Sequence, residues 1–168
     1  MIVDVQQGMF AVSPPIHRGD EIVRRIAGFL ARARAEGRPV IHVQHDGGPG
    51  DVLGKGSAGW PHHPLVAPRP GEIVVEKRHS SSFHDTDLRR RLCDAGIDRL
   101  VIAGMQTEMC VDSACRGAVA LGYRVVLVAD GHTTWDTPVI DAERIVAHHN
   151  RLLSQGFADV VAAADVKF

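Results

Sequence analysis

The sequence has few cysteines and no long apolar run. Its three cysteines, Cys93, Cys110 and Cys115, are odd in number and include no CxxC pair, which argues against a disulfide framework. No apolar stretch reaches the ~18 residues that a membrane helix needs, and the apolar start, Met1–Val5, is too short for a signal peptide. We therefore expect a cytoplasmic protein in a reducing setting, with at least one thiol available for chemistry.

An excess of charge is also missing. The chain has 19 basic and 20 acidic residues and a formal net charge of -1, so it lacks the electrostatic footprint of a nucleic-acid or membrane-surface protein. Hydrophobic residues make up 45% and charged residues 23%, as in ordinary globular proteins. The length of 168 residues suits one domain, and we predict a single domain over residues 1–168.

Short segments rich in valine and isoleucine alternate with segments of helical periodicity. This alternation predicts a three-layer α/β fold, in which helices cover both faces of a mainly parallel sheet. A doubly wound sheet of six strands in the order 3-2-1-4-5-6 would make the first and fourth strands neighbours. The expected strands are Met1–Val5, Val40–Val43, Ile73–Val75, Leu100–Ala103, Val125–Ala129 and Val160–Ala162. The expected helices are Glu21–Ala35, Asp85–Ala95, Glu108–Leu121 and Asp141–Gln155.

One long segment, Gln44–Gly71, fits neither pattern. It contains seven of the 17 glycines and is rich in proline. A loop of this length inside a compact domain is usually a lid or a pocket wall. Trp60 and Leu65 favour that interpretation over a disordered insertion, because both side chains need burial.

Cys110 lies where a strand leads into a helix. Thr107 is a good N-cap, which places Cys110 in the first helical turn, where backbone N–H groups are unpaired and the helix dipole favours negative charge. We expect a lowered thiol pKa there and an oxyanion hole made of the same N–H groups. The alternative is a small buried residue that only packs the helix on the sheet, as we expect for Cys93 and Cys115.

Two charged residues also fall at the ends of predicted strands. Asp4 interrupts an apolar strand, where a carboxylate is costly unless it has a function, and Lys77 follows Ile73–Val75. The carboxyl ends of parallel strands meet at one edge of a sheet, so Asp4, Lys77 and Cys110 are expected to converge there. Asp4 would then act as a base toward the thiol, and Lys77 would keep the carboxylate of Asp4 ionised. If each residue is considered alone, Asp4 could cap a turn and Lys77 could be an ordinary surface lysine.

In this combination the sequence resembles the isochorismatase-like cysteine hydrolases, which include nicotinamidases, N-carbamoylsarcosine amidases and streptothricin hydrolases. The resemblance extends over nearly the whole chain. Asp, Lys and Cys in this order, each with the expected neighbours, make it specific. The matching segments are Ile2–Gln6 with Gly8–Phe10, Glu76-Lys77 with Ser82-Phe83, Gly104–Thr107 with Cys110-Val111, Gly122-Tyr123 and Ala129–Gly131.

The resemblance implies roles for these residues. Cys110 would attack a carbonyl carbon to give an acyl-enzyme, Asp4 would serve as base and then as acid, and Lys77 would stabilise the charges. It also implies a cis peptide bond between Met105 and Gln106, with the N–H groups of Gln106 and Cys110 forming the oxyanion hole. Family members usually assemble, so we expect a homo-oligomer, either a dimer or a tetramer.

The remaining parts of the site are less specific. We predict that Phe10, Trp60, Phe83 and Thr107 contact a small-molecule substrate, although the aromatic residues could equally be core residues. Nicotinamidases carry an Asp-x-His metal site after the second strand, but here the order is His45-Asp46. We therefore predict no metal and no cofactor, and leave open whether His45, His62 and His63 gather around an ion. Asp4 lies only three residues from Met1, which is short for a central strand, and we leave open whether the natural chain begins earlier.

The leading hypothesis is a cysteine-dependent hydrolase that cleaves a C–N bond of a small amide, lactam or carbamoyl compound. Isochorismatases proper hydrolyse a vinyl ether without needing the cysteine, so that activity is the first alternative. The second is a catalytically idle member of the fold that serves as an oligomeric scaffold. Thiol reactivity of Cys110 separates the first hypothesis from both alternatives.

Overall fold

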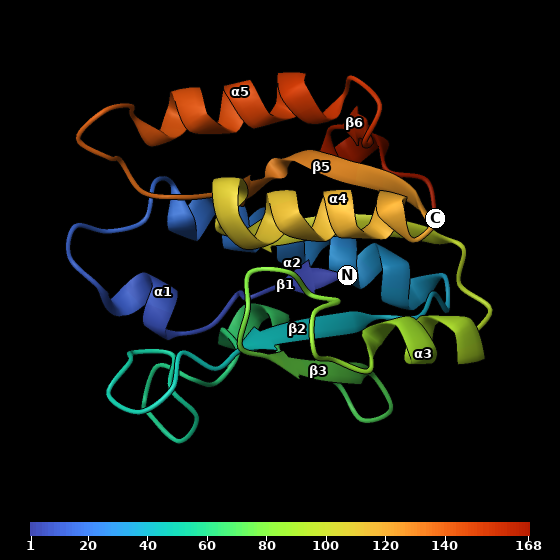
Figure 1. Cartoon of the computed structure of the whole chain (residues 1–168), viewed down its shortest axis with the longest axis horizontal. Helices are drawn as coiled ribbons and strands as arrows, with labels where there is room; N and C mark the ends of the chain where they lie inside the picture. The colour runs from blue at the N-terminus through green and yellow to red at the C-terminus, as the bar shows by residue number, and fades with distance from the viewer.

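The computed structural model describes residues 1–168 and contains one sheet of six parallel strands (Figure 1). The order is β3-β2-β1-β4-β5-β6, as the sequence predicts. The chain passes outward from β1 to β3 and then returns to β4 beside β1, which leaves a switch point between β1 and β4. The strands are β1 (Ile2–Val3), β2 (Ile41–His45), β3 (Ile73–Lys77), β4 (Arg99–Met105), β5 (Arg124–Thr133) and β6 (Asp159–Val161).

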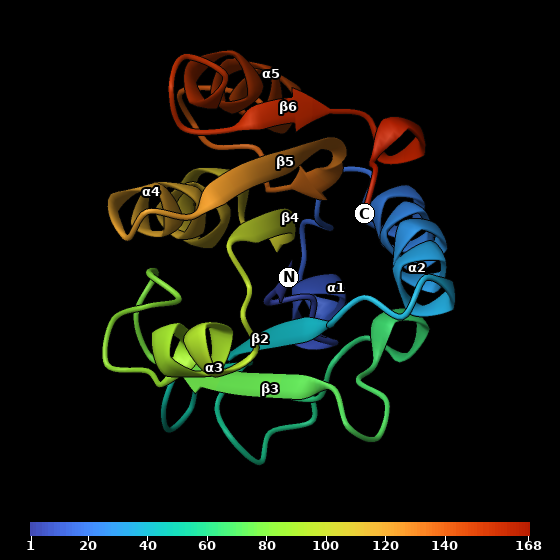
Figure 2. The same cartoon turned by 90° about the vertical axis from the view of Figure 1, so that its right-hand side faces the viewer.

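Helices cover both faces of this sheet (Figure 2). On one face α2 (Gly19–Ala35) buries a stripe that includes Ile26 and Leu30. On the other face α3 (Leu88–Asp94) and α4 (Asp112–Ala120) bury Leu88, Leu92 and Ala114, with Leu153 of α5 (Ala142–Leu153) in the same core. Two buried cores of 17 and 16 residues result, one on each face of the sheet. The prediction that helices cover both faces is confirmed.

The contact between β1 and β4 is unusually close at Gly104. The residue pairs with Val3 and has a φ of 139°, a conformation that side chains rarely tolerate. A Cβ atom at this position would lie 2.0 Å from the carbonyl oxygen of Val3. Glycine is therefore required for the strand that carries Asp4 to lie against the strand that leads to Cys110.

The element boundaries differ from the expected ones in a few places. β1 is two residues long because Asp4 adopts a left-handed conformation, with a φ of 52°, which ends the strand early. β5 runs on to Thr133, four residues beyond the predicted end. A short helix, α1 (Gly8–Ala11), was not expected. Asp141 caps α5 by accepting a hydrogen bond from the N–H of Arg144 at 2.9 Å.

The first two residues of the segment Gln44–Gly71 complete β2, and the rest is a loop with one short 3-10 turn at Pro64–Val66. Its backbone bonds back to the start of the chain: the N–H of Gln7 donates to Pro61, and the N–H of His63 donates to Val5. The loop therefore lies along the carboxyl edge of β1, as expected for a wall of the site. No helix in the structure combines the length and the apolar character needed to cross a bilayer.

Candidate active site

Asp4, Lys77 and Cys110 meet at the carboxyl edge of the sheet. The Nζ atom of Lys77 lies 2.6 Å from Oδ2 of Asp4 and 3.1 Å from Sγ of Cys110. The side chains of Asp4 and Lys77 are fully buried, and Cys110 is half-buried. The convergence of the three groups, predicted from their positions at strand ends, is thus present in the structure.

Strand register brings these groups together. Lys77 is the last residue of β3 and pairs with His45 at the end of β2, while Asp4 follows Val3 at the end of β1. The left-handed backbone at Asp4 lets its N–H bond to Val43 at 3.0 Å and redirects the chain after the strand. A non-glycine residue in this conformation costs on the order of 1 kcal/mol, and such costs gather at functional sites.

Four groups surround the Lys77 ammonium. Besides the carboxylate and the sulfur, it donates to the carbonyl oxygen of His79 at 3.0 Å, and Nδ1 of His45 lies 3.4 Å away. Burial and the nearby ammonium lower the pKa of His45, so this ring is neutral and able to accept. Lys77 is therefore held by several partners and is not the surface lysine of the alternative interpretation.

The Cys110 thiol is protonated at rest, which corrects the expected low pKa. Burial raises its pKa to about 12, and the negative charge of Asp4 adds to this effect, while Lys77 opposes it. Burial also raises the pKa of Asp4, again against the ammonium. Desolvation is the largest cause because burial removes the water that would stabilise the thiolate. A thiolate must therefore be formed by proton transfer within the site.

The buried carboxylate has room for that proton. The oxygens of Asp4 face only the Lys77 ammonium and the Cys110 thiol and accept no hydrogen bond from any other group of the chain. Its pKa is raised from the ordinary value, which makes it a stronger base than an exposed aspartate. Asp4 thus has the position and basicity to take the proton of Cys110.

Cys110 sits in a turn that the sequence did not predict. Residues Thr107–Val111 form a single π-helical turn, labelled η2, in which the N–H of Val111 donates to the carbonyl of Gln106 at 3.0 Å. The N-cap is Gln106, so the prediction that Thr107 is the N-cap was wrong by one residue. π-helical turns of this kind are rare and frequent at functional sites.

The start of η2 presents a free backbone donor. The Met105–Gln106 peptide bond is cis, as the resemblance implied. The N–H of Gln106 donates to no group of the chain. In this it resembles the unpaired N–H groups of the first turn of a helix. A carbonyl oxygen of a bound substrate is the kind of acceptor that such an N–H can hold.

A buried chain of hydrogen bonds supports η2 from behind. The hydroxyl of Thr107 lies 2.8 Å from Nδ1 of His132, and Nε2 of His132 lies 2.9 Å from Oδ1 of Asn150. Because Asn150 donates through its amide nitrogen to Ala129, its oxygen accepts and the imidazole proton lies on Nε2. Thr107, expected to contact substrate, is buried and donates to His132 instead. No sequence signal marked His132 or Asn150, since their roles depend on contacts between distant elements.

The cavity beside Lys77 is polar rather than apolar. It has a volume of about 290 Å³, and no hydrophobic residue lines it. The residues that line it are Asp46, Lys55, Glu76, Lys77, Arg78, His79 and Asp85. None of the aromatic residues expected to contact substrate is part of this lining. Phe10 lines a separate hollow beside α2 and packs on His63, Phe83 stacks on Tyr123, and the ring of Trp60 lies under Lys55.

The loop histidines do not gather around a common point. His62 packs edge-on against His42, and His63 uses Nδ1 to accept from the N–H of Leu65. Asp46 accepts from two backbone N–H groups and from Arg78, so its carboxylate is already occupied. His45, His62 and His63 therefore form no group of metal-ligating atoms.

Comparison with known proteins gives a family model and related sequences. The family model described as the isochorismatase domain matches residues 1–165. A streptothricin hydrolase of Streptomyces noursei is 41% identical over 138 residues, which is 82% of this chain and 50% of that protein. The maleamate amidohydrolase of Pseudomonas putida is 29% identical over 147 residues, covering 77% of this chain and 69% of that protein.

A solved structure extends the likeness to three dimensions. The crystal structure of an isochorismatase from Pseudomonas putida KT2440 superposes with a TM-score of 0.95 at 32% identity, covering 99% of this chain and 88% of that one. The chain spans about half the length of the two streptothricin hydrolases it matches. With a family model over nearly its full length and a solved relative of the same fold, the chain belongs to the isochorismatase family.

Proposed function

We propose that this protein hydrolyses a C–N bond of a small amide, lactam or carbamoyl compound, with Cys110 as the nucleophile. The observation that carries the proposal is the buried Lys77 ammonium, which lies 2.6 Å from Asp4 and 3.1 Å from the Cys110 sulfur. A thiol, a base and a cation within one contact shell form the arrangement that nucleophilic catalysis requires. The amidohydrolase and streptothricin hydrolase relatives support cleavage of an amide-type bond.

The first half-reaction forms a thioester. The carboxylate of Asp4 takes the thiol proton as the sulfur of Cys110 attacks the carbonyl carbon, and the C=O electrons move onto oxygen. The N–H of Gln106 donates to this oxyanion. The tetrahedral intermediate then collapses, the C–N bond breaks, and protonated Asp4 gives its proton to the departing nitrogen. Ammonia or an amine leaves, and the acyl group stays on sulfur.

The second half-reaction restores the enzyme. Asp4, again ionised, takes a proton from a water molecule that attacks the thioester carbonyl. Collapse of the second tetrahedral intermediate breaks the C–S bond, and the Cys110 sulfur recovers the proton from Asp4. Whenever Asp4 is ionised or Cys110 is a thiolate, the ammonium of Lys77 is the counter-ion of that group.

The cavity indicates a small and polar substrate. Its volume of about 290 Å³ is at the lower end of the range for ligand pockets, and its lining is charged. Lys77 belongs both to this lining and to the catalytic set, so a substrate that reaches the site through the cavity meets charged side chains. We therefore expect substrates with hydrogen-bonding groups near the scissile amide.

The test is a screen of small polar amides, ureas and carbamoyl compounds with release of ammonia as the readout. We expect Cys110→Ala and Asp4→Asn to abolish turnover of any substrate found while keeping the fold by circular dichroism. Cys93→Ala is the matched control: Cys93 is exposed on α3, not buried as expected from the sequence, and the variant should remain active. Full activity in Cys110→Ala would overturn the nucleophile.

The same variants separate the alternatives. Vinyl-ether hydrolysis of isochorismate would proceed without the thiol, so turnover of isochorismate by Cys110→Ala would support that activity instead. An idle scaffold would turn over neither isochorismate nor any compound of the screen, and the wild type and Cys110→Ala would be equally inactive. The contacts of the Lys77 ammonium with both Asp4 and Cys110 favour a working enzyme over the scaffold.

We also propose that the protein works as a homo-oligomer in a reducing, cytoplasmic setting. Met109, next to the nucleophile, is 46% exposed and Val139 is 91% exposed, and apolar side chains of this kind gain from a partner surface. All three cysteines are free thiols, which favours a reducing compartment. Sedimentation velocity tests the assembly: a dimer or tetramer is expected, and a monomer at high concentration would contradict it.

A further inference from the structure

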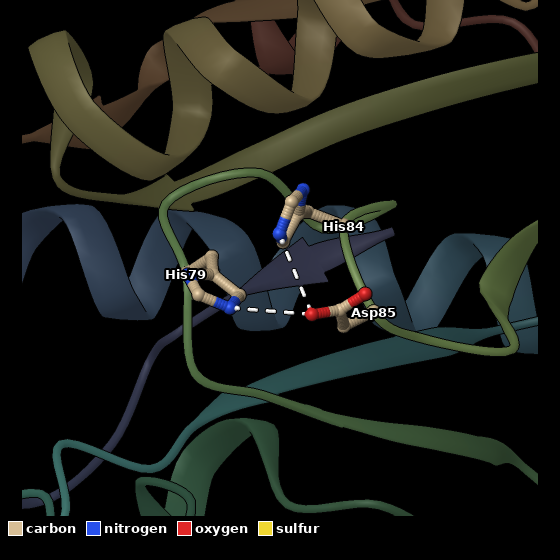
Figure 3. A group of neighbouring side chains, drawn as sticks. All are labelled: His79, His84 and Asp85. Carbon is tan, nitrogen blue, oxygen red and sulfur yellow. Dashed lines mark ion pairs between the residues drawn. The ribbon is translucent and has the colours of Figure 1, made fainter.

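The loop between β3 and α3 brings together three side chains that the proposed reaction does not use. His79, His84 and Asp85 all project from this loop, and their rings and carboxylate face one another (Figure 3). Nε2 of His79 lies 3.6 Å from Oδ2 of Asp85, and Nε2 of His84 lies 3.4 Å from the same oxygen. The ligand atoms of the three residues are all within 4.8 Å of one another.

These separations match those of ligands around one metal ion. Zinc binds imidazole nitrogen and carboxylate oxygen at about 2.0–2.1 Å in tetrahedral geometry, which places neighbouring ligand atoms roughly 3.3 Å apart. The two nitrogen–oxygen distances, 3.4 and 3.6 Å, need only small rotations to reach that value. The centroids of the two rings lie 4.2 Å apart and the ring planes are nearly perpendicular, at 80°.

The three side chains have no other partner in the chain. Neither ring nor the carboxylate of Asp85 makes a hydrogen bond with another residue, and all three side chains are at least half exposed. Asp46, on the other wall of the same cavity, differs, because its oxygens are occupied by backbone N–H groups and Arg78. The loop therefore offers a set of two imidazoles and one carboxylate that is accessible and uncommitted.

We propose that His79, His84 and Asp85 bind one Zn²⁺ ion. Two nitrogen ligands and one oxygen ligand suit zinc and disfavour Mg²⁺ and Ca²⁺, which select oxygen-only sites. The set leaves a fourth position for water or for an anionic group of a ligand. The site is separate from the His45, His62 and His63 segment and from the Cys110 thiol.

An ion bound at this loop would also affect the position of Lys77. The carbonyl oxygen of His79 accepts a hydrogen bond from Lys77 at 3.0 Å, and His79 and Asp85 line the same polar cavity as Lys77. An ion bound by His79, His84 and Asp85 fastens the two ends of the loop together. It thereby fixes the carbonyl that helps to orient the ammonium.

The test is isothermal titration of the untagged protein with ZnCl₂ at about pH 7.5, where free imidazole is mostly neutral. We expect one equivalent to bind to the wild type. His84→Ala and Asp85→Asn should each weaken binding at least about tenfold, and MgCl₂ should give no binding. The control is His148→Ala, which removes an exposed histidine from the His148–His149 pair on α5, where no carboxylate completes a site. Its affinity should match the wild type.

A cobalt titration distinguishes the proposed ligands from the thiols. Co²⁺ at His79, His84 and Asp85 gives ligand-field bands without a sulfur-to-cobalt charge-transfer band, whereas ligation by Cys93 or Cys110 gives one. No binding by the folded wild type, unchanged affinity in the His84→Ala/Asp85→Asn double variant, or a charge-transfer band lost in a cysteine variant would each overturn the proposal. Because these residues are exposed, thermal melts should show all variants folded.

Discussion

Replacing Lys77 with methionine removes the ammonium that pairs with the buried Asp4. The charges are 2.6 Å apart, so with an effective dielectric constant of about 20 their attraction is roughly 6 kcal/mol. The ammonium lies 3.1 Å from the Cys110 sulfur, for which the same relation gives roughly 5 kcal/mol with a thiolate. Moving the proton from thiol to carboxylate thus changes the attraction by only about 1 kcal/mol. Lys77 stabilises the negative charge on either partner.

Without this cation the base is lost. Burial is the largest cause of the raised pKa of Asp4, and Lys77 opposes it, so the Lys77→Met variant raises the pKa further. The carboxyl group is then protonated at pH values where the wild type is ionised, and the basic form appears only at higher pH. We expect kcat/KM at neutral pH to fall at least about 10³-fold, with the acid limb of the pH–rate profile moved to higher pH.

The assay is ammonia release measured across the pH range in which the protein stays folded. Lys167→Met is the matched control, since it removes an exposed lysine near the C-terminus, and its profile should follow the wild type. An acid limb at the wild-type position in Lys77→Met, with kcat/KM reduced less than tenfold, would refute the role assigned to the ammonium.

Three further perturbations test the scaffold of the site. Gly104→Ala places a Cβ atom 2.0 Å from the Val3 carbonyl oxygen, so unfolding in urea should show a loss of roughly 3 kcal/mol or more; wild-type stability would contradict this packing. Asn150→Ala leaves Nε2 of His132 without its acceptor, and we expect kcat to fall about tenfold or more with KM little changed, because the turn at Thr107 is displaced. A change in KM alone would argue against a positioning role.

The pKa of His132 is lowered to about 4 by burial, so the folded state favours the neutral ring. Its contribution to stability is present above the unfolded pKa of about 6.5 and is lost as the pH falls toward 4, about 3 kcal/mol in all. Urea unfolding at several pH values should show this loss, and His132→Gln should flatten the curve; an equally steep curve in the variant would exclude His132 as its origin.

The sheet and the meeting of the three reactive groups could be predicted from the sequence. Runs of valine and isoleucine mark the buried strands, and a parallel sheet places the ends of all its strands at one edge. Asp4 and Lys77 are unusual in such runs, so their polarity was itself the signal. The order of the strands then required only that β1 and β4 be neighbours, which Gly104 makes possible.

Features that depend on burial could not be predicted. The position of Cys110 at a helix start suggests a low pKa, but its desolvation follows from packing between η2, β3 and the end of β1. The π-helical turn adds no distinctive residue to the sequence, and the bonds from Thr107 through His132 to Asn150 join elements far apart in the chain. The polar lining of the cavity was also not predicted. In a sequence, aromatic residues suggest a pocket wall even where they only pack on other side chains.

The most direct measurement is rapid-quench mass spectrometry of the intact protein during turnover of an amide that releases ammonia. The mechanism predicts a transient mass increase equal to the acyl part of the substrate, located by digestion on the peptide that contains Cys110. An acyl group found on any other residue, or steady turnover through many cycles with no adduct at the shortest quench times and full activity in Cys110→Ala, would contradict the covalent route.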